Sequence, residues 1–162
     1  MICRSFEPIC AQDARVLIVG SMPSVKSLAE AQYYAHPRNA FWPILFRLFG
    51  EENTADYEKK KALIRAHHLA LWDVAAVCER EGSLDSGMRH IATNDFESLY
   101  ARCPDIGAVL CNGGTAHSLF LKSGAAGARR VVRLPSTSPA YTMPFERKLA
   151  AWREALSAEG II

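Results

Sequence analysis

Residues 15–32, RVLIVGSMPSVKSLAEAQ, contain an expected strand, a turn and a helix in immediate succession. The run 15–20 is rich in β-branched residues and ends in glycine, which is typical of a buried strand. The helix expected over 24–32 begins at Ser24, a residue type whose side chain caps helix N-termini. A strand that leads directly into a helix indicates an α/β fold, in which crossover helices join parallel strands.

The same alternation continues to the end of the chain. Further strands are expected at residues 69–77, 106–113 and 130–134. Helices are expected at residues 41–50, 55–68, 95–103, 115–124 and 144–160. Residues 78–94 are polar and contain glycine, as loops do, and Thr142 is the expected cap of the last helix. The pattern predicts a three-layer α/β/α sandwich around a four-stranded parallel sheet, in one domain spanning residues 1–162.

Composition limits the function classes. The chain has 162 residues, of which 49% are hydrophobic, enough for one domain with a substantial core. It contains neither an apolar run near the roughly 20 residues that cross a bilayer nor a signal peptide. The five scattered cysteines form no C-x-x-C pair, which argues against disulfides or a zinc site and favours the cytoplasm. The net charge of +2 means that any DNA binding must come from a local arrangement of residues.

Unusual residues follow each expected strand. In open parallel sheets, ligands bind beyond the carboxyl ends of the strands. The segments there are GSMPS (20–24), WD (72–73), CNGG (111–114) and LPSTSPAYT (134–142). We therefore expect the functional site at this edge of the sheet.

Two of these segments suit phosphate groups to different degrees. Segment 20–24 lacks the lysine of a Walker A loop and the glycines of a dinucleotide site, so its local pattern favours a plain strand-to-helix turn. Segment 134–142 carries several hydroxyl side chains between prolines, which together with backbone N–H groups suit a phosphate diester. The alternative is that it only caps the last helix.

Four further side chains at this edge are candidates for chemistry. Cys111 and His117 could form a nucleophile and its base, although a buried structural cysteine is the favoured interpretation. Asn112 ends a strand, where a neutral amide can read a base edge or orient a water molecule. Asp73 is either a general base or the cap of the following turn, and the local pattern favours the cap.

The stretch YYAHPRNAFWPIL (33–45) places aromatic rings near the same edge. The ring of Tyr33 or Tyr34 could stack on a planar ligand. Asn39 opens the next helix, where its side chain can point toward the ligand, cap the helix, or do both. An aromatic platform, neutral amides and a hydroxyl-rich loop describe a pocket for a nucleobase extruded from DNA.

Four motifs together resemble the uracil-DNA glycosylase superfamily. They are LIVGSMPS (17–24), YYAHPRNAFWPIL (33–45), LCNGGTAH (110–117) and LPSTSPAYT (134–142). The resemblance covers essentially the whole chain and is greatest to the hypoxanthine-DNA glycosylase branch, followed by the mismatch-specific uracil and thymine glycosylases. The superfamily fold is a three-layer α/β/α sandwich around a four-stranded parallel sheet, in agreement with the alternation of elements.

The resemblance implies site residues. Tyr34 falls where the mismatch-specific relatives stack a residue on the flipped base, and the loop 135–141 corresponds to the one that pinches DNA phosphates. The implied base-binding residues are Gly20, Ser21, Met22, Tyr34 and Phe41. The implied DNA-binding residues are Arg38, Ser136, Thr137, Ser138, Ala140 and Tyr141, with Ala140 or Tyr141 entering the vacated base stack.

The resemblance also implies which residue is catalytic. Met22 stands where the mismatch-specific enzymes have an asparagine that positions the hydrolytic water, and a thioether cannot do this. Asn39 matches the asparagine of the hypoxanthine branch that looks catalytic, so it is the expected catalytic residue, with Asn112 as a second contributor.

The implied activity is that of a monofunctional DNA glycosylase. It would hydrolyse the N-glycosidic bond of deaminated bases, preferentially hypoxanthine, and leave an abasic site for base excision repair, without metal or cofactor. The expected partner is double-stranded or single-stranded DNA, and the expected state is a cytoplasmic monomer. Alternatives are a mismatch-specific uracil or thymine glycosylase, a non-catalytic module that binds nucleotides or nucleic acid, and a hydrolase that uses Cys111 and His117.

Overall fold

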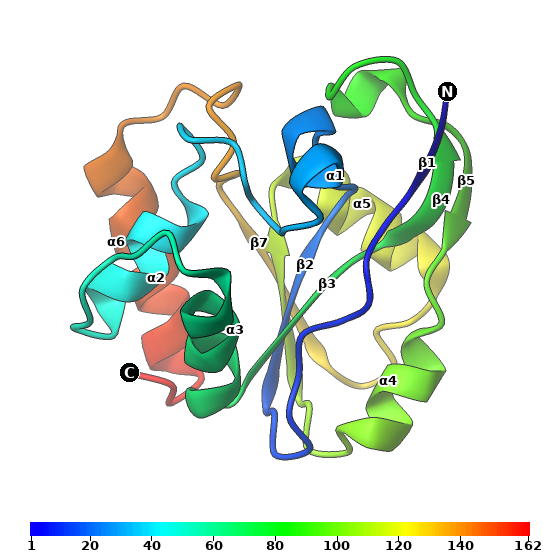
Figure 1. Cartoon of the computed structure of the whole chain (residues 1–162). Coiled ribbons are helices and arrows are strands. Elements are labelled where there is room, and N and C mark those ends of the chain that lie inside the picture. The colour runs from blue at the N-terminus through cyan, green and yellow to red at the C-terminus, as the bar shows by residue number, and fades with distance from the viewer.

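A four-stranded parallel sheet lies at the centre of the computed structural model, which describes residues 1–162 (Figure 1). Its strands, in the spatial order β3-β2-β6-β7, are β2 (Val16–Gly20), β3 (Leu69–Asp73), β6 (Ala108–Asn112) and β7 (Arg130–Leu134). Every residue of β2, β3 and β6 is buried, which explains why these strands are apolar apart from Asp73 and Asn112 at the ends of β3 and β6. The predicted α/β fold with a four-stranded parallel sheet is confirmed.

Helices cover both faces of this sheet (Figure 1). On one face lie α2 (Phe41–Leu48), α3 (Tyr57–Ala66) and α6 (Phe145–Ala158), and on the other α4 (Phe96–Arg102) and α5 (Gly114–Ser123). The short helix α1 (Val25–Glu30) follows β2 at the upper edge of the view. Ser24 caps α1 as predicted, because its hydroxyl accepts a hydrogen bond from the Ser27 N–H at 3.1 Å. No helix is both long and apolar enough to span a bilayer.

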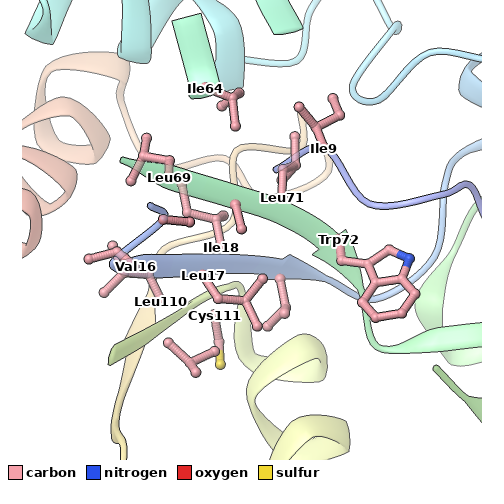
Figure 2. Close-up of a cluster of buried hydrophobic side chains, with 14 of the residues drawn as sticks. Ile9, Val16, Leu17, Ile18, Ile64, Leu69, Leu71, Trp72, Leu110 and Cys111 are labelled. Carbon is pink, nitrogen blue, oxygen red and sulfur yellow. The ribbon is translucent and has the colours of Figure 1, made fainter. Parts of the chain in front are cut away.

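The main hydrophobic core fills the space between the sheet and its helices. Figure 2 shows part of it, where Ile18 and Leu71 lie on the face of the sheet that carries Ile64 of α3, and Leu17 points to the opposite face. All four side chains are completely buried. Because burial of one such side chain contributes about 1.5–3 kcal/mol, the core fixes the strand ends that carry the site.

A second, antiparallel sheet was missed by the sequence prediction. It contains β1 (Ile2–Arg4), β4 (Ala75–Glu79) and β5 (Arg89–Thr93), in the order β1-β4-β5. The expected strand 69–77 is therefore broken at Val74, and the expected loop 78–94 contains strand residues. The loop prediction failed because β5 is exposed along most of its length and has no apolar alternation to reveal it.

The start of α6 also differs from the prediction. Pro144 occupies the cap position, and no side chain hydrogen-bonds the first turn of the helix. The prediction that Thr142 caps this helix is therefore wrong. Thr142 lies two residues too early to reach the free N–H groups.

Candidate functional site

A cavity of about 580 Å³ lies at the carboxyl ends of the parallel strands, near α1 and the loop that follows β7 (Figure 1). Most residues expected at the site line it. They are Gly20, Ser21 and Met22 after β2, Tyr34 and Asn39 before α2, Asn112 after β6, and Ser136, Thr137, Ser138, Ala140 and Tyr141 in the loop 135–141. Topology thus brings together residues from four separate parts of the chain, as expected for the edge of a parallel sheet.

Tyr34 forms an aromatic wall of the cavity. Its ring stacks on Phe41, with 4.1 Å between the ring centroids and 25° between the ring planes. Phe41 is 1% exposed and does not line the cavity, so it supports the Tyr34 ring from behind. Tyr34 has a φ of +54°, an uncommon conformation for a residue with a side chain. With Phe41 covering one face, the opposite face of the Tyr34 ring is the one available to a planar ligand.

The floor of the cavity forms where β2 and β3 end side by side. Gly20 pairs in register with Asp73. A Cβ atom at Gly20 would stand 2.6 Å from Asp73 Oδ1 and 2.8 Å from the Tyr34 hydroxyl, so only glycine leaves room for both polar groups. Asp73 Oδ2 and the Tyr34 hydroxyl are buried without any hydrogen-bond partner in the protein.

The surroundings of Asp73 favour its neutral form. The pKa of Asp73 is raised to about 7, mainly by burial and in smaller part by the Asp85 carboxylate, while the Arg80 guanidinium opposes the rise. Burial, reinforced by Asp73, likewise raises the pKa of Tyr34. The capping role favoured for Asp73 from the sequence is wrong, because Asn94 instead secures this turn by donating to the Asp73 main-chain carbonyl.

Asn112 connects the end of β6 to the loop 135–141. Its Nδ2 donates to Thr137 Oγ1, and its Oδ1 accepts from the Thr137 N–H, both at 2.9 Å. The two residues are 9% and 1% exposed, respectively. The Asn112 amide therefore already holds the loop, and only its remaining N–H and lone pair are free for a ligand.

Asn39 lies two residues before α2, whose cap position is Ala40. Its Oδ1 accepts from the Phe41 N–H at 2.9 Å, so the helix orients the side chain, and its Nδ2 has no acceptor in the protein. The adjacent Ala40 N–H donates to the Thr137 carbonyl at 3.0 Å, which ties this turn to the loop 135–141. Arg38 is exposed and does not line the cavity, and its N–H donates to His36 Nδ1.

Two side chains of α6 hold the loop 135–141 by hydrogen bonds to its backbone. Lys148, only 4% exposed, donates from Nζ to the Ser138 carbonyl at 3.0 Å. Trp152 Nε1 donates to the Pro135 carbonyl at 3.2 Å. Tyr141 at the loop tip is 45% exposed. The loop is therefore ordered in advance of any ligand.

Known proteins share this arrangement of sequence and fold. A sequence profile of the uracil DNA glycosylase superfamily matches residues 7–158. The chain belongs to the uracil DNA glycosylase superfamily. The family resemblance of the four motifs is thus confirmed.

Two relatives within the superfamily carry the name hypoxanthine DNA glycosylase. The Methanosarcina acetivorans protein is 37% identical over 118 residues, which are 72% of this chain and 74% of that protein. The Methanosarcina barkeri protein is 29% identical over 153 residues, 94% of this chain and 96% of that protein. The solution NMR structure of a Methanosarcina acetivorans protein described as a candidate uracil DNA glycosylase has a TM-score of 0.83 and 30% identity, covering 99% of both chains.

Met22 occupies the position where the family resemblance implies an asparagine in the mismatch-specific branch. It is 7% exposed, lines the cavity, and packs with Cys3, Ala75 and Cys78 where the two sheets meet. This position therefore offers no polar atom to a water molecule, and its side chain serves packing instead.

The segment 83–86 was not anticipated as part of the site, yet it lines the cavity. Ser21 Oγ donates to Asp85 Oδ1 at 2.6 Å, and the Val25 N–H donates to Ser83 Oγ at 2.9 Å. The short polar pattern GSLDS looks like a loop, and nothing in the sequence indicates that it folds back over the turn after β2.

Arg133 is a second site residue that sequence reasoning missed. It is exposed, lines the cavity, and places its guanidinium over Gly114 at the start of α5. The strand predicted at 130–134 is present as β7, and it is an edge strand whose residues are largely exposed or partly exposed. The signal available was a charged residue one position before the end of the expected strand, next to the hydroxyl-rich loop.

Cys111 has the properties of a structural cysteine. It is completely buried, it does not line the cavity, and burial raises the pKa of its thiol to about 12. Because the thiolate is the reactive form, this position is unsuited to nucleophilic catalysis. No group of three or more His, Cys, Asp or Glu side chains is placed to hold a metal ion.

Proposed function

We propose that the protein is a monofunctional DNA glycosylase that removes deaminated bases, preferentially hypoxanthine, and leaves an abasic site for base excision repair. The observation that carries this proposal is the cavity itself. There the Tyr34 ring, which stacks on Phe41, and buried polar groups lie beside the hydroxyl-rich loop. Such a pocket suits a base that has been rotated out of the duplex. The names of two similar proteins support hypoxanthine as the base.

The cavity suggests how damaged DNA is held by a single copy of the chain. The extruded base lies against the free face of Tyr34, with its outer edge toward Asp73 at the floor. The phosphates on either side meet the loop 135–141, where hydroxyl and N–H groups can bind them. Arg133 at the rim supplies a positive charge without an ion pair. We infer that duplex DNA is the main substrate, and that single-stranded DNA fits the same path.

The bond breaks with positive charge developing on the sugar and negative charge on the departing base. An amide cannot act as a strong base, so Asn39 orients the attacking water and hydrogen-bonds the reacting groups. Its contact with the Phe41 N–H fixes the amide before the substrate arrives. Fixed dipoles of this kind act most strongly in a site that excludes water.

Met22 supports a preference for hypoxanthine over uracil. The position that holds a water-positioning asparagine in the mismatch-specific branch is filled here by a packed thioether. Uracil or thymine excision from mismatches is the second candidate activity, which the superfamily membership favours.

The direct test uses duplexes that contain one deoxyinosine or one deoxyuridine, followed by alkali to cleave abasic sites. We expect faster release of hypoxanthine than of uracil, and no strand cleavage before alkali. Asn39→Ala should slow release by about 100-fold, within the range of one general catalytic or dipolar group. Asn53→Ala, which removes the same group from an exposed loop, is the control. Full activity in Asn39→Ala contradicts its catalytic role, and base recognition without release supports a non-catalytic binding module instead.

A further inference from the structure

Two polar atoms at the cavity floor have no partner in the protein. They are Asp73 Oδ2 and the Tyr34 hydroxyl, both fully buried. Buried polar groups in folded proteins are nearly always hydrogen-bonded, so each exception requires an explanation. Asp73 and Tyr34 are both lining residues of the cavity, so a ligand that fills it lies against them.

Depth in the cavity assigns different parts of the nucleotide to different residues. Asp73 is 3% exposed and Asn39 is partly exposed, so we place Asp73 in the deeper part of the cavity and Asn39 nearer to its opening. A flipped nucleotide enters base first and remains attached to the strand through its sugar. Asp73 therefore faces the outer edge of the base, and Asn39 faces the glycosidic bond.

The neighbours of Asp73 leave its carboxyl group without a counterion. The titratable and charged groups around it are Tyr33, Tyr34, Tyr57, Arg80 and Asp85. Only Arg80 is cationic, and its guanidinium donates to the Pro23 carbonyl rather than to Asp73. An unpaired carboxylate is strongly disfavoured in such a buried position, so the protonated acid is the main form below about pH 7.

We propose that the neutral carboxyl group of Asp73 binds the extruded base directly and selects bases that carry a ring N–H beside a ring carbonyl. The carboxyl O–H donates to the ring carbonyl, which is O6 in hypoxanthine, and the second carboxyl oxygen accepts from the neighbouring N1–H. This inference rests on the proposed function and deepens it, because it names the feature of the base that is recognised.

The same contact assists the reaction. When the bond between C1′ and N9 breaks, its electron pair passes to the purine and part of the negative charge reaches O6. The Asp73 O–H then donates to a more negative oxygen, which stabilises the departing base. The proton stays on Asp73. The water that adds to C1′ gives its proton to the departing purine anion, so hypoxanthine leaves as a neutral molecule.

The test is the single-turnover rate of base release from a deoxyinosine duplex, measured from about pH 5.5 to about pH 8.5, where hypoxanthine retains its N1 proton. The wild-type rate should fall toward tenfold per pH unit above about pH 7, as the donor is lost. Asp73→Asn keeps a donor and an acceptor in nearly the same place. Its rate should lie within about tenfold of wild type near pH 6 and should not fall at higher pH.

Two further variants complete this experiment. Asp73→Ala should release hypoxanthine at least about 100-fold more slowly, because it lacks both groups. Asp105→Asn makes the same chemical change at an exposed site and should retain the wild-type profile. A wild-type rate that rises with pH, together with an inactive Asp73→Asn, would overturn the proposal and assign Asp73 as a carboxylate base acting on water.

A substrate change tests recognition separately. A duplex that carries purine deoxyriboside, which lacks the 6-oxygen, should lose its base much more slowly than the deoxyinosine duplex. Equal rates for the two substrates would overturn the proposal. If wild type releases hypoxanthine but these tests fail, only the role of Asp73 is wrong, whereas no release from any duplex refutes the proposed function as well.

Discussion

At the scale of single residues, the site depends on Gly20, because two polar groups occupy the space that a side chain at this position would fill. Gly20 allows the Asp73 carboxyl and the Tyr34 hydroxyl to approach the end of β2 from different elements. The sequence places Asp73 at the same edge of the sheet, as a general base or, by its local pattern, a turn cap. Its register with Gly20, and hence its place above this residue, depends on the pairing of β2 with β3, which no local pattern predicts.

Gly20→Ala should disturb this floor. Its Cβ would overlap Asp73 Oδ1 and the Tyr34 hydroxyl, so at least one must move. We expect a loss of about 1–3 kcal/mol in the free energy of unfolding and at least tenfold slower base release. The measurements are urea unfolding and single-turnover release. Gly107→Ala is the control, since its Cβ would meet only a backbone oxygen at 4.0 Å. Equal effects in the two variants contradict the role of Gly20.

Asp73 should also make stability depend on pH. Its pKa rises from 3.8 to about 7 on folding, so between these values the folded state binds more protons than the unfolded state. Stability therefore decreases as pH rises through this window, by up to about 1.4 kcal/mol per pH unit. Asp73→Asn does not titrate, so its stability relative to wild type should increase from about pH 4 to about pH 7 and then level off. Urea unfolding across this range measures the free energy of unfolding of Asp73→Asn minus that of wild type. A decrease of this difference with rising pH contradicts the prediction.

At the scale of elements, the sequence predicted the central strands and the cap of α1, which depend on neighbouring residues, but not the contacts between distant parts of the chain. The central strands were predictable because each is an apolar run that is buried on both faces. The cap of α1 was predictable because it lies within one turn. The small sheet was not, because β5 is held by backbone pairing and carries no buried face. Tyr34 and Asn39 could be placed at the site from their motif, whereas the contact of Asn112 with Thr137 joins residues far apart in the chain.

Asn112→Ala tests whether the loop 135–141 is held by this contact. The variant loses two hydrogen bonds to Thr137 and leaves a buried N–H without its partner. We expect a loss of about 2 kcal/mol in the free energy of unfolding and slower base release. A double-mutant cycle with Thr137→Val should show a coupling energy of about 1 kcal/mol. Additive effects of the two substitutions indicate that the amide does not hold the loop.

At the scale of the whole molecule, the local arrangement of charge matters more for DNA binding than the net charge. A net charge of +2 gives little general attraction to DNA. Binding must therefore come from the edge of the parallel sheet, where the cavity, the loop 135–141 and Arg133 lie together. The opposite edge, near α4 in Figure 1, is remote from this surface.

Arg133→Ala should weaken DNA binding at this edge. The affinity of wild type for duplex DNA should decrease as salt rises, because phosphate contacts release counterions. Loss of one such contact should reduce the slope of log affinity against log salt by about 0.9. Arg102→Ala, an exposed arginine at the end of α4, should leave affinity and slope unchanged. Identical slopes for wild type and Arg133→Ala place this guanidinium away from the DNA backbone.

The most direct test of the central claim is to identify the product released from a duplex that contains one deoxyinosine. The reaction mixture is separated before any alkali treatment, and the free bases are identified by mass spectrometry. We predict free hypoxanthine in equal amount to abasic sites in an unbroken strand, with the yield strongly reduced in Asn39→Ala. Binding of the duplex without release of any base would contradict the assignment of this cavity as a glycosylase site.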